Sequence, residues 1–392
     1  MTTIAAVPST PDRSAPVPTL AAPPGLQGVV VARTTIGDVR GEEGFYHYRQ
    51  YSAVELARTR SFEDVWHLLH VGELPDSSAS VAFARRVRAM RELPPRTAAL
   101  LPSLAQEPPV QALRTVLSAA GAELGMRPTW DLDAAARAED ALRLCALVPT
   151  ALAALHRLSR GLDPVAPDPG LGHVQDYLRM MLGEDPRPEH VAAVEAYLIS
   201  TIDHGLNAST FTARVVASTG ADLAACLVAA LGALSGPLHG GAPSRALDAL
   251  EEIGPPDRAD EWARERVLAG DRLMGFGHAV YRTADPRSVL LREVAEGLGG
   301  ELVARAVAVE ATVLEVLAEL KPGRRLATNV EYYAGVVMEQ CGIPREMFTP
   351  TFAVSRVLGW SAHVLEQARE QKIYRPAAEY VGPPAPQPVP AA

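Results

Sequence analysis

The sequence predicts a mainly α-helical fold with a small N-terminal β-hairpin. Apolar residues recur at helical spacing in three separate segments, 62–69, 191–202 and 354–368. Two early runs rich in β-branched and aromatic residues, Gly28–Ala32 and Phe45–Tyr48, predict strands instead. We therefore expect a hairpin followed by a long helical body.

The residues around these segments predict where each one ends. Gly37-Asp38 and the Gly-Glu-Glu-Gly run at 41–44 favour turns between the two strands. Gly72 can adopt the left-handed conformation that ends many helices. Pro350 predicts a break immediately before the last helix.

The amino-acid composition narrows the classes of partner that the protein can have. The chain has 392 residues, 48% of them hydrophobic and 21% charged, as in an ordinary globular protein. The net charge of −9 argues against nucleic acid or an anionic membrane surface as a partner. Three widely separated cysteines, Cys145, Cys226 and Cys341, are expected to be small buried hydrophobes. Their pattern fits a reducing compartment, and we expect a cytoplasmic protein.

The two ends differ from the middle. Residues 1–24 and 381–392 are rich in proline and small residues, so we expect both to be disordered tails. The most apolar internal run, Leu223–Leu234, is too short to span a bilayer and predicts a buried helix. No membrane association is expected.

Several common functional motifs are missing. The sequence contains no GxGxxG, no GxxxxGK[ST], no GxSxG and no HExxH, so it gives no support to nucleotide-fold or hydrolase chemistry. His67 and His70 lie three residues apart on a predicted helix, but no third ligand is nearby. We expect both to be ordinary helix histidines and predict no metal site.

Three histidines stand among glycines and prolines at helix boundaries. They occur in DHGLNAST (His204), SGPLHGGAP (His239) and MGFGHAVYR (His278). Glycines let the backbone approach a ligand, and a histidine near backbone donors can be held neutral to polarise a carbonyl group. Any one of these histidines alone is as well explained as a loop residue; the three together indicate a site.

Four segments of the sequence resemble those of a known family. SGPLHGGAP, MGFGHAVYRTADPR, NVEYYAGVVM and FAVSRVLGWSAHVLEQ occur in the order and spacing of the citrate synthases, above all the compact bacterial citrate and 2-methylcitrate synthases. The resemblance runs from about Gly25 to Gly382. It implies a homodimer with two helical domains per subunit: a large domain from 25–239 and 343–380, and a small one from 240–342.

The resemblance also implies residue roles. His239 would hydrogen-bond the thioester carbonyl, Glu331 would remove the acyl α-proton, and His278 would act as acid for the new alkoxide. His204 would contact oxaloacetate. The matching carboxylate-binding arginines are Arg287, Arg356 and, from the other subunit, Arg375. Guanidinium groups suit this role because they bind carboxylates in bidentate fashion.

The coenzyme A contact region of the family matches the backbone around Leu273, Gly275 and Gly277, together with Arg282. Lys321, Arg324 and Arg325 are weak candidates for its phosphates and are more typical of a solvated basic loop. The reaction condenses acetyl-CoA with oxaloacetate to give citrate and free CoA. No permanently bound cofactor is implied, because the CoA thioester is a co-substrate.

The sequence departs from the family pattern at two places. The base is usually aspartate, whereas this chain has Glu331, one methylene longer. The stretch around His204 reads Thr-Ile-Asp-His-Gly where His-Ala-Asp-His-Glu is usual, which bears on how oxaloacetate is anchored.

Three alternatives stay open. 2-Methylcitrate synthesis from propionyl-CoA differs by one methyl group, which a pocket discriminates by only about 1–3 kcal/mol. A catalytically weak homologue that binds CoA or a dicarboxylate would explain Glu331. The third alternative belongs to a different class of protein: a helical interaction protein whose histidine-containing loops are only turns. Oxaloacetate would not stabilise such a protein.

Overall fold

The computed structural model describes residues 20–236, 239–240, 242–278, 280–324, 326–370 and 372–390. Thr34–Ile373 form one compact unit, called the body below. The described residues before Thr34 and after Ile373 belong to a second unit. Among these described residues there is a short 3₁₀-turn, Pro24–Leu26, and otherwise neither helix nor strand.

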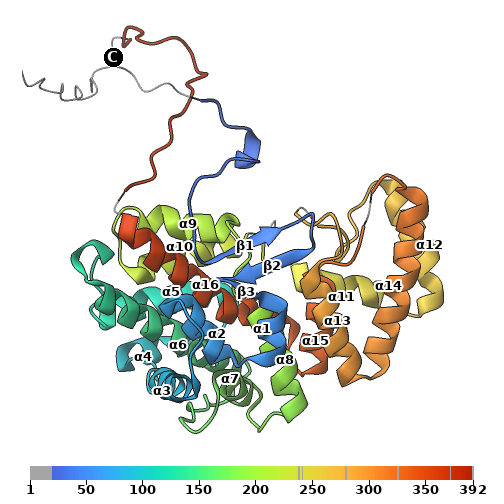
Figure 1. Cartoon of the computed structure of the whole chain (residues 1–392), viewed down its shortest axis with the longest axis horizontal. Coiled ribbons are helices and arrows are strands. Elements are labelled where there is room, and N and C mark those ends of the chain that lie inside the picture. Colours follow the sequence, from blue (N-terminus) through green and yellow to red (C-terminus); the bar gives the residue numbers. More distant parts are fainter. Residues whose placement is uncertain are drawn as a thin grey trace, which may run out of the picture. The chain divides into compact units, whose positions relative to one another are not determined.

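The body is mainly helical, as predicted (Figure 1). Its described residues form sixteen α-helices: α1 Ala53–Thr59, α2 Phe62–Val71, α3 Ser77–Arg88, α4 Pro95–Leu104, α5 Pro109–Glu123, α6 Ala134–Ser159, α7 His173–Leu182, α8 Pro188–Ser200, α9 Ala208–Ala217, α10 Leu223–Leu234, α11 Ala242–Ile253, α12 Ala259–Ala269, α13 Pro286–Leu298, α14 Glu301–Leu320, α15 Val330–Gln340 and α16 Phe348–Glu370.

The one sheet among the described residues has the antiparallel order β1-β2-β3, with β1 at Gly37–Arg40, β2 at Phe45–Tyr48 and β3 at Tyr51–Ser52. The prediction of β2, and of a turn at 41–44, is confirmed. The predicted strand at Gly28–Ala32 is wrong, and Gly37-Asp38 is strand rather than turn.

The cause of this error is tertiary packing, which overrides β-propensity. Val30 is 87% exposed and has no partner strand, whereas β2 is anchored on the body. Tyr46 and Tyr48 are buried and donate their hydroxyl groups to the Ser200 and Ile199 carbonyls at the end of α8, at 3.0 and 2.9 Å. The hairpin therefore forms where two tyrosines fix it to α8.

The helix boundaries follow local chemistry. Ser61 caps the start of α2, and Gly72 ends it at φ 110°, as predicted. The last helix begins two residues before Pro350, so the predicted break at that proline is wrong. Proline is tolerated in a first turn because the amide hydrogen it lacks would have no helical partner there.

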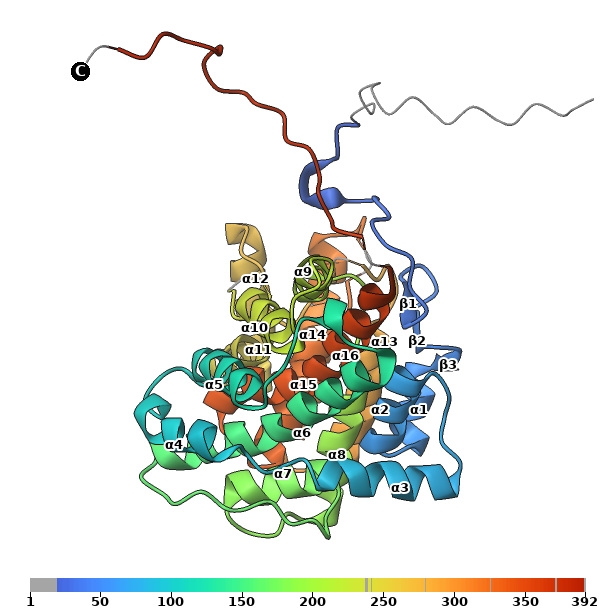
Figure 2. The same ribbon diagram turned by 90° about the vertical axis from the view of Figure 1, so that its left-hand side faces the viewer.

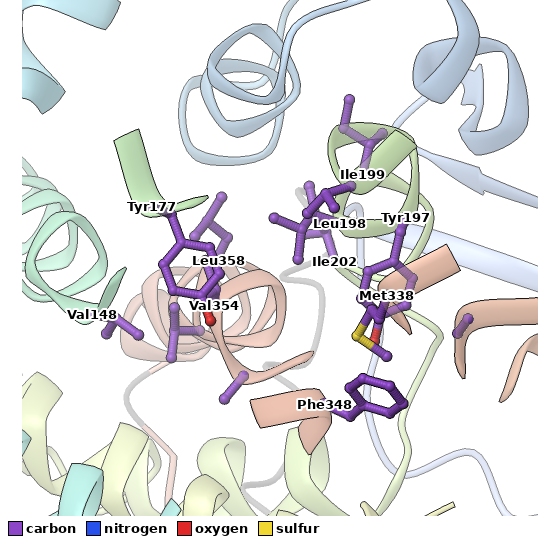
Figure 3. Close-up of a cluster of buried hydrophobic side chains, with 14 of the residues drawn as sticks. Val148, Tyr177, Tyr197, Leu198, Ile199, Ile202, Met338, Phe348, Val354 and Leu358 are labelled. Carbon is purple, nitrogen blue, oxygen red and sulfur yellow. The ribbon is translucent and has the colours of Figure 1, made fainter. Parts of the chain in front are cut away.

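The core is organised around α16, which packs against α2, α5, α6, α8, α9 and α10 (Figure 2). Figure 3 shows part of this core, where Leu198 and Ile202 face Val354 and Leu358, and Tyr197 lies near Met338 and Phe348. Leu223–Leu234 forms helix α10, half of it buried, and the three cysteines are buried and free, as predicted.

Within the described residues one helix, α6, is long and apolar enough to cross a membrane by length and composition alone. In this structure 78% of its apolar window is buried inside the protein, which is typical of a core helix.

Helices α12 and α14 lie at one side of the body, away from α4 and α6 (Figure 1). The expected division at residues 240 and 342 into a large and a small domain stays a prediction, as does the disorder expected at the two ends of the chain.

Candidate active site

The three histidines all lie in loops that follow helices. His204 lies between α8 and α9, His239 between α10 and α11, and His278 between α12 and α13. The first and third meet directly: the His204 and His278 rings are 5.7 Å apart, and each contacts Tyr281. Segments more than 70 residues apart in sequence thus converge at one place.

An ion pair lies beside these two histidines. Arg287 donates to both carboxylate oxygens of Asp285, through Nε at 3.0 Å and Nη2 at 2.8 Å, and both side chains are almost fully buried. Burial would lower the pKa of Arg287, but Asp285 raises it above its usual value. Burial, then Arg287 and Arg356, lower the pKa of His204 well below its ordinary value. His204 is therefore neutral.

The tautomer of His278 follows from its backbone contacts. Its Nδ1 accepts the amide hydrogens of Val280 and Tyr281, at 2.9 and 3.1 Å. Burial and then Arg287 lower the pKa of His278 to about 4. A neutral ring whose Nδ1 is an acceptor carries its proton on Nε2. Arg287 Nη2, a group that can only donate, lies 3.2 Å from this Nε2, so the Nε2–H of His278 can serve a ligand once the Arg287 guanidinium turns to the ligand instead.

Arg356 on α16 is buried but incompletely paired. Its side chain is 4% exposed, and Nε and Nη1 have no hydrogen-bond partner among the described residues. The guanidinium stacks on Phe352, 4.7 Å from the ring centre, and burial lowers its pKa. A buried donor without a partner costs free energy that a bound acceptor would recover. Arg356 is thus suited to bind an anion.

Glu331 and His239 line one small cavity of about 20 Å³, together with Tyr197, Thr201 and Phe352. The cavity is just large enough for one water molecule. Burial raises the pKa of Glu331 to about 7, with Arg287 opposing the shift and Asp285 adding to it. Burial and then Arg356 lower the pKa of His239 to about 4. The pair combines a carboxylate that titrates near neutral pH with a neutral imidazole.

His239 is held from behind by Ser209, whose Oγ lies 2.8 Å from its Nε2. The Ser209 hydroxyl also receives the Trp360 indole N–H at 3.2 Å and donates its own hydrogen to Asn207 Oδ1 at 2.8 Å. While it does so, the serine accepts from Nε2–H of the neutral ring; when its hydrogen turns to Nε2 instead, the ring proton is on Nδ1. Ser209 therefore controls which nitrogen of His239 can donate to a ligand.

The residues expected to contact coenzyme A are dispersed. Leu273 is buried, and Gly275 is required by packing, because a Cβ there would lie 2.8 Å from the Tyr332 ring at a φ of +86°. Gly277 pairs through its N–H with Ala327 at 2.8 Å. Arg282 and Arg324 both line a cavity of about 650 Å³ that also reaches His278 and Asp285. Lys321 is exposed, and Arg325 lies outside the described residues.

Seven of the predicted residues thus gather in or beside the site: His204, His239, His278, Arg282, Arg287, Glu331 and Arg356. Arg375 is exposed and belongs to the second unit, so its role stays a prediction. His67 and His70 are half-buried helix residues, as expected; they contact the Glu73 carbonyl and Ser361.

Sequence reasoning missed several supporting residues. Tyr281 lies 2.9 Å from His204, and Asp285 binds Arg287. Both fall inside the MGFGHAVYRTADPR motif, so the motif itself was a signal for them. Ser209 and His363 also lie in segments singled out above, DHGLNAST and FAVSRVLGWSAHVLEQ, but their pairing carried no signal, because their partners come from distant parts of the sequence.

Comparisons with known proteins identify the family. The family model described as citrate synthase, C-terminal domain, matches residues 25–377. A citrate synthase of Haloferax volcanii is 39% identical over 367 residues, which cover 91% of this chain and 95% of the relative. A 2-methylcitrate synthase of Mycobacterium tuberculosis is also 39% identical, over 360 residues that cover 91% of this chain and 90% of the relative.

Solved structures give the same result. The citrate synthase of Pyrobaculum aerophilum matches with a TM-score of 0.87 at 37% identity, over 97% of this chain and 99% of that one. The citrate synthase of Thermoplasma acidophilum, in a ternary complex with carboxymethyl coenzyme A and oxaloacetate, matches with a TM-score of 0.85 at 28% identity, over 94% and 98% of the two chains. With a family match over most of its length, this chain belongs to the citrate synthase family.

Proposed function

We propose that this enzyme condenses acetyl-CoA with oxaloacetate, releasing citrate and free CoA, and that the residues described above carry out the reaction. The observation that carries the proposal is the buried Arg356 guanidinium, with two donors lacking partners beside three histidines of lowered pKa. Such a site binds a dicarboxylate and offers neutral N–H donors to carbonyl groups.

Glu331 is the base that removes the α-proton of the acyl group. A base works best when its pKa is near the operating pH, and burial brings the pKa of Glu331 to about 7. The α-proton is weakly acidic, so the developing enolate needs a donor at the thioester oxygen. His239, which lines the same cavity, supplies that donor while staying neutral.

The enol carbon then attacks the ketone carbon of oxaloacetate, and a new carbon–carbon bond forms. The Nε2–H of His278 faces the ketone oxygen and gives its proton to the alkoxide as charge develops there. Water hydrolyses the resulting thioester to citrate and CoA. The reaction is redox-neutral, and the CoA thioester is its co-substrate, so no permanently bound cofactor is required.

Arg287 and Arg356 bind the carboxylates of oxaloacetate, with His204 as a further contact. Arg287 is already held by Asp285, so it is pre-positioned. Arg282 and Arg324 line the large cavity next to His278, where they are placed to meet the phosphates of CoA. Leu273, Gly275 and Gly277 shape the adjoining backbone. The predicted cytoplasmic location rests on the three buried, free cysteines.

The functional unit is proposed to be a homodimer in which Arg375 completes the site of the partner subunit. The outward side of α10 supports a second copy as its cover, because Ala225, Val228, Ala229 and Gly232 on it are apolar and only half-buried. A helix that is apolar all round is normally covered on every side.

A mixing experiment tests the shared site. His278→Ala and Arg375→Met are each expected to be inactive alone. Mixed and re-associated subunits should recover about a quarter of wild-type activity, because half the dimers are mixed and each has one intact site. No recovery with demonstrated subunit exchange would place Arg375 outside the partner's site. Ala229→Glu on α10 should yield monomers by light scattering.

The second candidate substrate is propionyl-CoA, giving 2-methylcitrate. It is favoured by the M. tuberculosis relative, which is as similar to this chain as the H. volcanii citrate synthase. The acyl group would lie where Tyr197, Ala334 and Phe352 line the small cavity beside Glu331, which must widen to admit it, and the space gained sets the preference. One methyl group there changes the specificity ratio by about 10- to 200-fold.

The deciding experiment measures oxaloacetate-dependent CoA release with acetyl-CoA and with propionyl-CoA. Glu331→Gln and His278→Ala should each lower kcat by roughly 10²- to 10⁴-fold. The ratio of kcat/KM values chooses between the two thioesters. A folded wild-type protein that releases no CoA from either one would overturn the proposal. A large gain in kcat for Glu331→Asp would then indicate a homologue that retained the pocket but lost the reaction.

A further inference from the structure

A buried triplet of Arg214, His363 and Asp203 adjoins the site but contains none of the groups assigned above. The three residues come from α9, α16 and the loop after α8, and they are 0%, 1% and 3% exposed. Helix α9 packs against α16 (Figures 1 and 2). The triplet therefore joins three parts of the body at a place where water is excluded.

The hydrogen bonds of the triplet have a definite direction. Arg214 Nη1 lies 3.0 Å from His363 Nδ1, and His363 Nε2 lies 3.2 Å from Asp203 Oδ1. Arginine is always protonated and can only donate, so Nδ1 of His363 is an acceptor. The proton of His363 is then on Nε2, where it is donated to the Asp203 carboxylate.

Arg214 itself is held firmly. Its Nη1 also donates to Glu366 at 2.7 Å, and its Nε donates to Gln367 at 3.0 Å. Glu366 in turn accepts the backbone N–H of Thr35 at 2.7 Å, just before β1. The end of the triplet far from the site is thus anchored to both α16 and the segment that leads into the hairpin.

Asp203, at the other end, acts on the site in two ways, through a hydrogen bond and through its charge. Its Oδ2 accepts the Gly205 N–H at 3.2 Å, which closes a turn around His204. It is also the main carboxylate acting on buried Arg356, since after burial it has the largest electrostatic effect on the pKa of that guanidinium. Burial would raise the pKa of Asp203, but His363 and Arg356 hold it below its usual value.

We infer that Arg214 and His363 are positioning residues for oxaloacetate binding: they fix Asp203, which in turn sets the His204 turn and balances the charge of Arg356. This inference rests on the proposed function, because it assumes that His204 and Arg356 bind the dicarboxylate. The acyl half of the site, His239 and Glu331, makes no hydrogen bond to the triplet among those of the described residues.

The test compares His363→Leu with His363→Gln. Leucine removes both hydrogen bonds, whereas the amide of glutamine can accept from Arg214 and donate to Asp203. His363→Leu should raise KM for oxaloacetate by about tenfold or more, with KM for acetyl-CoA unchanged, and His363→Gln should restore most of the loss. His70→Leu is the matched control, because His70 also hydrogen-bonds α16, through Ser361, but lies outside the triplet.

Three results would each overturn the inference. They are a folded His363→Leu protein with an unchanged KM for oxaloacetate, an equal rise in both KM values, and the same rise in His70→Leu. If His363→Leu does not fold, Arg214→Lys gives a second reading, since lysine cannot reproduce the fork of donors. Calorimetric titration with oxaloacetate separates this inference from the proposed function: wild-type binding without turnover refutes the function alone.

Discussion

The surroundings of Arg287 and Arg356 differ although both arginines are buried in the same site. Arg287 is paired with Asp285, which accepts from its Nε and Nη2 through two oxygens and also accepts the Val330 N–H at 3.2 Å. Arg356 has a distant carboxylate, Asp203, and two donors without partners among the described residues. Asp285 holds Arg287 in place with or without a ligand, whereas Arg356 gains its missing hydrogen-bond acceptors only when a ligand binds.

The largest effect on stability is expected when Arg287, the arginine paired with Asp285, is removed. Arg287→Met leaves Asp285 buried without its cation, and breaking a buried pair in this way costs about 3–5 kcal/mol of stability. Urea unfolding of the ligand-free protein measures this loss. A midpoint equal to that of the wild type would mean that Asp285 is stabilised by its contacts with backbone N–H groups alone, and the contrast between the arginines would fail.

Binding of oxaloacetate should be the next largest effect. A ligand that binds only the folded state at 100 times its Kd stabilises that state by about 2.7 kcal/mol. Differential scanning fluorimetry should therefore show a clear rise in Tm with oxaloacetate in the wild type. In Arg356→Met at the same oxaloacetate concentration, the rise should be much smaller. Equal Tm shifts in both proteins would show that Arg356 does not bind oxaloacetate.

Removing Arg356 should separate binding from stability. Hydrogen bonds to a charged group contribute about 1.5–3 kcal/mol, so Arg356→Met should raise KM for oxaloacetate roughly 10- to 150-fold. Asp203 keeps its hydrogen bond from His363 in this variant, so the urea midpoint should stay much closer to that of the wild type than the midpoint of Arg287→Met does. Loss of stability together with binding would contradict the comparison.

The smallest effect concerns pH. Burial raises the pKa of Glu331 to about 7, and the base must be ionised to act. Below that pH, kcat/KM for acetyl-CoA should fall about tenfold per pH unit, and above it the value should level off. His239 and His278, each with a pKa lowered to about 4, add no second limb in this range. A flat profile from about pH 5.5 to 8 would exclude Glu331 as the base.

The sequence predicted the residues that carry the chemistry better than the contacts that hold them. His204, His278, Arg287 and Arg356 could be identified because they lie in contiguous motifs. The supporting pairs could not, because Ser209 meets His239 and Asp203 meets His363 only after the helices pack, and no local pattern records such a contact.

The same limit explains the errors in the fold. The β-propensity of Gly28–Ala32 was real but found no partner strand, while Gly37 entered a strand because Tyr46 and Tyr48 fix its neighbour to α8. Local patterns predicted α2 and its end at Gly72 correctly, since a capping serine and a left-handed glycine act within a few residues.

The turn of the β1–β2 hairpin packs against the loop that follows His278. A Cβ on Gly41 would overlap the Val280 carbonyl, and Arg282 donates its N–H to the Gly41 carbonyl at 3.0 Å. On a ribosome adding about 5–20 residues per second, Val280 emerges roughly 12–50 seconds after Gly41. The hairpin turn therefore lacks the loop it packs against until most of the chain has been synthesised. Translation speed and chaperone access during that interval would influence how much of the newly made protein reaches a working site.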